Sequence, residues 1–129
     1  MKINQQIWVF DAPDLAVESA FWAGVLGGTV DDYSESGWHM VKVDDQPRVG
    51  IQHVADHVSP DWPDGTPQQV HLDLWVEDFE SAHREVMSLG AKVLQPVDDS
   101  DPKEGYQVYA DPAGHPFCLC FLKETQKGR

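Results

Sequence analysis

The alternation of apolar and polar residues passes through the same series of elements twice. Residues 5–10 and 70–76 are short apolar segments, rich in β-branched and aromatic residues, which is typical of strands. Asp14 and Asp78 follow these segments, and each Asp precedes an amphipathic stretch that ends at a glycine. The repetition predicts two modules built from the same elements.

Each half continues in the same way after its helix. The first predicted helix starts near Pro13 with Asp11 as its N-cap. The predicted strands cover residues 5–10, 29–33, 38–44 and 48–54 in the first half and residues 70–76, 92–96, 106–110 and 116–122 in the second half. We expect the tail from Lys123 onward to be frayed.

The predicted fold class is α+β, with two βαβββ modules in tandem and curved mixed sheets around a cleft. The helices lie outside the sheets. Module 1 covers about residues 5–54, a proline-rich linker covers about residues 55–69, and module 2 covers about residues 70–122. The whole chain of 129 residues is then a single domain. A cleft between two sheets is a natural site for a small molecule.

The net charge of the chain limits the classes of molecule that it can bind. The chain carries 22 acidic and 9 basic residues, which gives a formal charge of −13. Such a surface repels phosphate backbones and anionic lipids, so we expect no nucleic-acid and no membrane partner, whereas cations are attracted. There is no secretory pattern and no long apolar run, and Cys118 and Cys120 are too far apart for an unstrained disulfide. We therefore expect a cytoplasmic protein with reduced thiols.

The order of short motifs along the chain resembles the vicinal oxygen chelate superfamily, which includes glyoxalase I, bleomycin-resistance proteins and extradiol dioxygenases. The motifs are Asp14-Leu15 with Phe21-Trp22, His71-Leu72-Asp73-Leu74 with Asp78-Phe79, Leu89-Gly90-Ala91, and Asp111 to Phe117. The closing stretch ADPAGHPFCLC is most similar to the small glyoxalase-like branch. The resemblance implies a homodimer, with the cleft formed within one chain or between two.

The resemblance also implies a divalent metal in the cleft, held by four ligands from the first and last strands of the two modules. Superposing the halves through Asp14 and Asp78 places Ile7 opposite His71, and superposing the last strands places Gln52 opposite Cys118. Ile7 cannot bind a metal, Gln52 is a weak ligand, and Cys118 suits soft metals. We therefore expect no tightly bound catalytic metal and no other cofactor; a labile metal at His71 and Gln52 is the alternative.

Alternation places His71, Asp73 and Trp75 on one face of the first strand of module 2. A histidine beside a carboxylate can act as a general base, so His71 and Asp73 are the candidate catalytic residues. The competing interpretation is a hydrogen-bonded pair that orders the strand.

His71 and Trp75 are also candidate ligand-binding residues, and four further side chains join them. Cys118 and Cys120 are interpreted as small apolar residues lining the cleft, with a nucleophilic Cys118 activated by His71 as the alternative. Gln52 either bonds a ligand or neighbouring backbone. Trp62, in the middle of the linker, is a candidate lid or aromatic wall.

Three functions are compatible with this pattern. The first is a metal-free protein that binds a small apolar or cationic compound, as in the bleomycin-resistance branch that the chain resembles. The second is a glyoxalase-type lyase or isomerase, or a dioxygenase, that uses a weak divalent metal or a His71/Asp73 acid–base pair. The third is a scaffold with a vestigial cleft. The degraded ligand set and the acidic charge favour the first.

Overall fold

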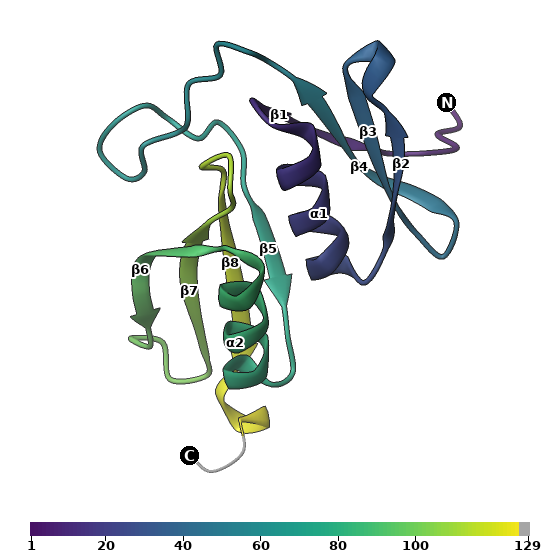
Figure 1. The fold of residues 1–129 in the computed structure, drawn as a ribbon. Helices are drawn as coiled ribbons and strands as arrows, with labels where there is room; N and C mark the ends of the chain where they lie inside the picture. The colour runs from purple at the N-terminus through teal and green to yellow at the C-terminus, as the bar shows by residue number, and fades with distance from the viewer. Residues whose placement is uncertain (127–129) are drawn as a thin grey trace. The chain divides into compact units, whose positions relative to one another are not determined.

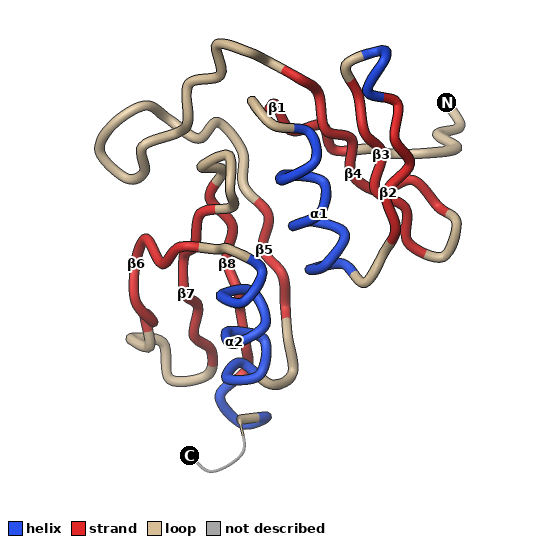
Figure 2. Tube along the Cα trace, viewed as in Figure 1, coloured by secondary structure: helices blue, strands red, loops and turns tan. Residues whose placement is uncertain are grey.

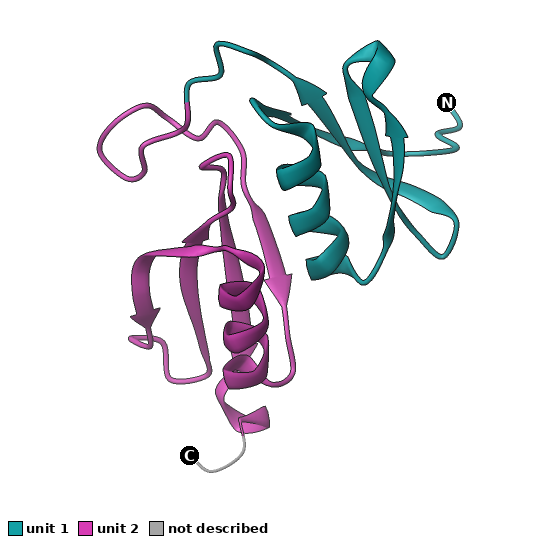
Figure 3. Ribbon diagram, in the orientation of Figure 1, with its two compact units in different colours: residues 1–58 teal, residues 59–129 magenta. Residues whose placement is uncertain are grey.

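A computed structural model describes residues 1–126 of the chain. In chain order these residues form β1 (Trp8–Ala12), α1 (Leu15–Leu26), β2 (Thr29–Tyr33), η1 (Ser34–Ser36), β3 (Trp38–Val43), β4 (Gln46–His53), β5 (Leu72–Trp75), α2 (Phe79–Leu89), β6 (Lys92–Asp98), β7 (Glu104–Ala110), β8 (Pro116–Leu122) and η2 (Lys123–Thr125) (Figure 1). Two compact units result: Met1–Val58, and the part of the chain from Ser59 onward (Figure 3).

Both units have the same sheet topology. The strand orders are β1-β4-β3-β2 and β5-β8-β7-β6. In each unit the first strand pairs in parallel with the last, and the remaining pairs are antiparallel. A parallel pair needs a long crossover, and the helix that follows the first strand begins it (Figure 2). The predicted α+β class and the two βαβββ modules are confirmed. Within residues 1–126, neither α1 nor α2 is long and apolar enough to cross a membrane.

The two helices begin and end with the same chemistry. The Asp14 carboxylate accepts from the backbone N–H of Val17 at 3.1 Å, and the Asp78 carboxylate accepts from that of Ser81 at 3.1 Å. Gly27 and Gly90 end the helices with positive φ angles of 69° and 112°, which glycine adopts without a steric penalty. Asp11 is therefore not the N-cap that the sequence predicted; the strand β1 runs past it to Ala12.

Aromatic contacts dominate the core of each unit. In the first unit the rings of Phe10 and Trp22 meet edge to face at a centroid distance of 5.2 Å. In the second unit the ring of Phe79 on α2 lies 4.7 Å from that of Phe121 on β8. Such pairs add roughly 0.5–1.5 kcal/mol to the gain from burial, so these contacts fasten each helix to its sheet.

A polar bond, buried in unit 1 and partly buried in unit 2, also joins helix to sheet at equivalent positions in the two units. In unit 1 the Ser19 hydroxyl on α1 bonds Nδ1 of His39 on β3 at 2.9 Å. In unit 2 Nδ1 of His83 on α2 bonds the Tyr109 hydroxyl on β7 at 2.7 Å. Burial raises the pKa of Tyr109 to about 12, so its hydroxyl stays protonated at neutral pH.

The C-terminal segment is better ordered than the sequence suggests. Lys123–Thr125 forms a short 3-10 turn, and the buried Gln126 side chain reaches the start of α2. Its Oε1 accepts from the backbone N–H of Phe79 at 2.9 Å, and its Nε2 donates to the Glu77 carbonyl at 2.8 Å. The prediction of a frayed tail is wrong for residues 123–126, and its last three positions lie outside the described residues.

Replacing Gln126 with alanine should lower the free energy of unfolding by roughly 1–2 kcal/mol, because the Phe79 N–H then loses its acceptor in a buried setting. Urea denaturation monitored by circular dichroism measures the change. Glu124→Ala, at an exposed position of the same turn, is the matched control. Equal stabilities for the two variants would show that Gln126 does not cap the helix.

Candidate functional site

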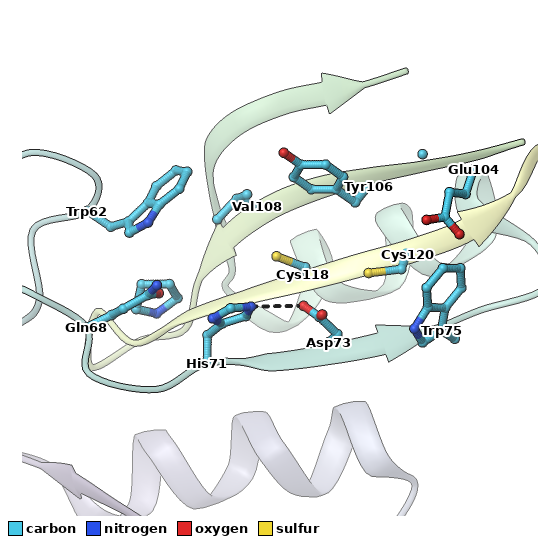
Figure 4. Close-up of a pocket in the computed structure, with 12 residues that line it drawn as sticks. Trp62, Gln68, His71, Asp73, Trp75, Glu104, Tyr106, Val108, Cys118 and Cys120 are labelled. Carbon is cyan, nitrogen blue, oxygen red and sulfur yellow. Dashed lines mark ion pairs between the residues drawn. The ribbon is translucent and has the colours of Figure 1, made fainter. Parts of the chain in front are cut away.

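A pocket of about 360 Å³ lies on the face of the second sheet, within unit 2. Its walls come from β5, β7 and β8 and from the segment that precedes β5 (Figure 4). The lining residues are Trp62, Gln68, His71, Asp73, Trp75, Glu104, Gly105, Tyr106, Val108, Pro116, Cys118 and Cys120. The pocket thus combines apolar and aromatic walls with a few polar groups, which is typical of small-molecule sites.

Strand alternation and register create this surface. In the parallel pair, Asp73 lies beside Cys118 and Trp75 beside Cys120. In the antiparallel pair, Val108 lies beside Cys118 and Tyr106 beside Cys120. Because side chains on paired positions point to the same face, these residues form one patch.

The His71 imidazole contacts the Asp73 carboxylate, with His71 Nε2 and Asp73 Oδ1 3.1 Å apart. His71 lies immediately before β5, and both side chains are partly exposed, at 40% and 51%. The predicted shared face of His71, Asp73 and Trp75 is thus present in the pocket (Figure 4). In this pair the carboxylate orients the imidazole, which is compatible both with acid–base chemistry and with an ordering role.

Cys118 and Cys120 form the floor of the pocket as free, buried thiols. Burial raises the pKa of Cys118 to about 12 and that of Cys120 to about 11, and the negative charge of Asp73 adds to both shifts. A thiol must ionise to act as a nucleophile. At neutral pH both groups are therefore neutral, as expected of small apolar lining residues, and activation of Cys118 by His71 is disfavoured.

Trp62 closes one end of the pocket and packs against Val108, Cys118 and Cys120. The loop that carries it is held by its own backbone: the N–H of Asp61 donates to the Thr66 carbonyl at 2.8 Å. Trp62 is half-buried, as befits an aromatic wall.

Sequence reasoning missed several lining residues, namely Gln68, Glu104, Gly105, Tyr106, Val108 and Pro116. Tyr106 and Val108 alternate on β7 as the other pocket strands do, and that pattern could have identified them. Glu104 lies between the predicted strands 92–96 and 106–110, and β7 begins there, two residues earlier than predicted. Gln52, by contrast, is an exposed residue on β4 of unit 1 and does not line this pocket.

The strand register corrects the comparison of the two halves. Asp11 pairs with Gln52 as Asp73 pairs with Cys118, so the counterpart of His71 is Val9, not Ile7. The error arose because Asp73 precedes the cap residue Asp78 by five positions whereas its counterpart Asp11 precedes Asp14 by three, so alignment through the helix caps shifts the strands. Valine, like isoleucine, has no atom that can bind a metal, so the position in unit 1 that is equivalent to His71 still provides no ligand.

Within unit 2, ligand atoms of His71, Asp73 and Cys118 lie within 4.8 Å of one another. An imidazole, a carboxylate and a thiol are residue types that suit zinc rather than a hard, oxygen-preferring ion. Two of these groups already bond each other, and the third carries a proton at neutral pH. The donors therefore fit a weak zinc site and do not fit the four-ligand metal site that the resemblance implies.

Comparison with protein families identifies the chain. The profile of the glyoxalase-like domain matches residues 8–120. The chain belongs to the glyoxalase-like domain family. This match confirms the predicted resemblance to the vicinal oxygen chelate superfamily. No curated protein matches the sequence significantly.

Solved structures share the glyoxalase-like fold over nearly their whole length. The fosfomycin resistance protein FosX from Listeria monocytogenes gives a TM-score of 0.70 at 15% identity, covering 97% of this chain and 98% of that one. FosX from Mesorhizobium loti gives 0.67 at 17% identity, covering 94% and 93%. A glyoxalase/bleomycin resistance protein/dioxygenase family enzyme from Burkholderia phytofirmans gives 0.64 at 14% identity, covering 90% and 96%. At these identities the likeness shows the fold alone.

The thiols of this glyoxalase-like chain should react slowly while it is folded. At about pH 8 we expect Ellman's reagent to modify Cys118 and Cys120 at least about ten-fold more slowly than in the urea-unfolded chain, because both folded thiols keep their protons. The raised pKa values also make the free energy of unfolding depend on pH. The contribution of the two thiols to this free energy is fully present below about pH 9 and is lost as pH rises toward 11 and 12, because the thiols of the unfolded chain ionise first.

Cys118→Ala and Cys120→Ala, made singly, assign the reaction to each thiol. A thiol that reacts in the folded chain as fast as in the unfolded chain would contradict the inference that both thiols are neutral. It would favour a nucleophilic role for that cysteine.

Proposed function

We propose that this protein binds a small molecule in the unit 2 pocket, without a tightly bound catalytic metal. The observation that carries the proposal is the pocket itself: a cavity of about 360 Å³ with aromatic walls at Trp62, Trp75 and Tyr106. A volume in this range accommodates a compact organic ligand, and concave apolar surface with a few polar groups is the usual form of a ligand site.

The electrostatics of the floor support binding rather than nucleophilic chemistry. Cys118 and Cys120 present neutral thiols, and His71 and Asp73 are partly exposed and bonded to each other. This arrangement offers hydrogen bonds and apolar contact, while the thiols lack the ionised state that attack on a substrate requires.

The names of the similar structures give limited guidance to the ligand. FosX is a fosfomycin resistance protein. Fosfomycin is a phosphonate and carries negative charge. No lysine or arginine occurs among the described residues that line the pocket, while Asp73 and Glu104 do. The pocket therefore does not suit a phosphonate, because two carboxylates would repel it.

The second candidate function is a glyoxalase-type lyase or isomerase, or a dioxygenase, that uses either a weakly held divalent metal or a His71/Asp73 acid–base pair. The clustering of ligand atoms from His71, Asp73 and Cys118 favours it. These side chains would hold the ion, and the bound metal would supply Lewis acidity.

Trp62→Ala should weaken binding of a neutral apolar probe by about ten-fold, because a stacked aromatic wall contributes on the order of 1 kcal/mol or more. The probe is N-phenyl-1-naphthylamine, whose fluorescence rises in apolar surroundings. Met87→Ala, at an exposed position of α2 outside the pocket, is the control. No saturable binding to the wild-type chain, or equal affinities for both variants, would contradict the proposed function.

Elemental analysis of protein purified without added metal should find well below one equivalent of zinc, iron, nickel or manganese per chain, because the donor set lacks a fourth ligand and needs a thiol to lose its proton. Dialysis against EDTA should leave probe binding unchanged. One equivalent of metal that is lost in His71→Ala would favour the second candidate instead.

Homodimer formation and a cytoplasmic location remain predictions from the sequence and its resemblance. Sedimentation equilibrium of the full chain tests the first of these directly.

A further inference from the structure

We propose that the ligand of this pocket is an organic cation, an ammonium group attached to an apolar or aromatic body. The inference rests on the proposed function and specifies the class of compound. It follows from the charge of the lining residues, from the orientation of the aromatic groups and from the kind of cation that such walls can hold.

The pocket presents negative charge in two places. Asp73 projects from β5 and Glu104 from the start of β7, and both line the cavity (Figure 4). The Cys120 thiol lies between their elements and senses both carboxylates, since each raises its pKa. Among the described residues that line the pocket, the side chain able to carry positive charge is that of His71, which is bonded to Asp73. A cation in the cavity therefore experiences attraction from two sides.

The aromatic side chains lie where they can contact a cation. Trp75 occupies the same end of the pocket as Glu104, and Tyr106 lies between Val108 and Glu104 (Figure 4). The Trp75 side chain is 58% exposed and that of Tyr106 38% exposed, so their rings retain accessible surface in the unliganded chain. Ring faces attract cations, tryptophan most strongly, and a carboxylate at the same place reinforces the attraction.

The two ends of the pocket differ in a way that orients the ligand. One end carries Trp62 and Gln68, with Val108 beside them, and the other carries Trp75 and Glu104 (Figure 4). The first end suits an apolar or aromatic body, and the Gln68 amide can hydrogen-bond a polar substituent. The second end suits the ammonium group. Cys118 and Cys120 give the ligand a neutral floor between the ends.

The backbone fixes the position of Glu104. The Asp101 carboxylate accepts from the Lys103 N–H at 2.7 Å and from the Glu104 N–H at 3.3 Å. The ammonium of Lys123 donates to the carbonyls of Asp99 and Asp101, each at 2.6 Å. These bonds hold the turn before β7 and thereby place the backbone of Glu104 at the start of that strand.

An inorganic ion is a poorer match for this end of the pocket. Magnesium and calcium bind to six or more oxygen atoms, and rings and thiols supply none. A tertiary or quaternary ammonium group is weakly hydrated and gains from contact with ring faces. The aromatic walls therefore favour a weakly hydrated organic cation over a strongly hydrated inorganic cation.

The test compares two probes of nearly equal shape, benzyltrimethylammonium and its neutral analogue 2,2-dimethylpropylbenzene. Isothermal titration calorimetry measures affinity, and the indole NMR signals of Trp62 and Trp75 report where the probe binds. We expect the cation to bind about ten-fold more tightly than the neutral probe. Glu104→Gln should lower the affinity for the cation about three-fold or more and leave the neutral probe unaffected.

Glu85→Gln is the matched control, because it removes the same charge from an exposed position of α2 outside the pocket. If the neutral probe binds as tightly as the cation or more tightly, the inference that the ligand is an organic cation is wrong, whereas the proposed small-molecule binding still holds. Binding of neither probe, with no change in either indole signal, would overturn both. An equal loss of cation affinity in both variants would show that net charge alone acts, which overturns the assigned ammonium site.

Discussion

The parallel pairing of β5 with β8 is the constraint on which the pocket depends. It places Asp73 against Cys118 and Trp75 against Cys120 in one register, so polar, aromatic and thiol groups share a face. A slip of β5 by one residue would turn Asp73 and Trp75 toward α2 and away from the two cysteines. The helix crossover makes this pairing possible, because neighbouring parallel strands cannot be joined by a tight turn. The caps and aromatic contacts that secure α2 thus support the pocket indirectly.

The fold followed from the sequence because its signals are local and occur twice. An Asp cap, a helix and a terminal Gly recur at Asp14 to Gly27 and at Asp78 to Gly90. The errors lie where two local signals compete. Asp11 beside Pro13 has the chemistry of a cap, yet strand pairing with β4 extends through it. Tertiary hydrogen bonds decided the outcome, and no local pattern contains them.

The site was predictable in part for the same reason. Alternation found His71, Asp73 and Trp75, together with the two cysteines of β8. Glu104 could not be found in this way, since it precedes the predicted strand and reaches the pocket through a turn held by Lys123. Comparing the halves by residue number also failed at Ile7. The distance from equivalent strand positions to the helix cap differs by two residues between the halves. Counting back from the cap therefore reaches a residue on the correct face of the strand but at the wrong position, and only the strand register identifies the equivalent residue.

The polar bonds between helix and sheet bear on how the two halves diverged. Ser19 with His39 and His83 with Tyr109 are equivalent pairs, but the histidine lies on the sheet in one unit and on the helix in the other. A small hydroxyl faces a ring in the first pair, and two rings face each other in the second. Exchanging one helix alone would combine Ser19 with Tyr109, or two histidines with each other. At this position each helix is therefore matched to the sheet of its own half.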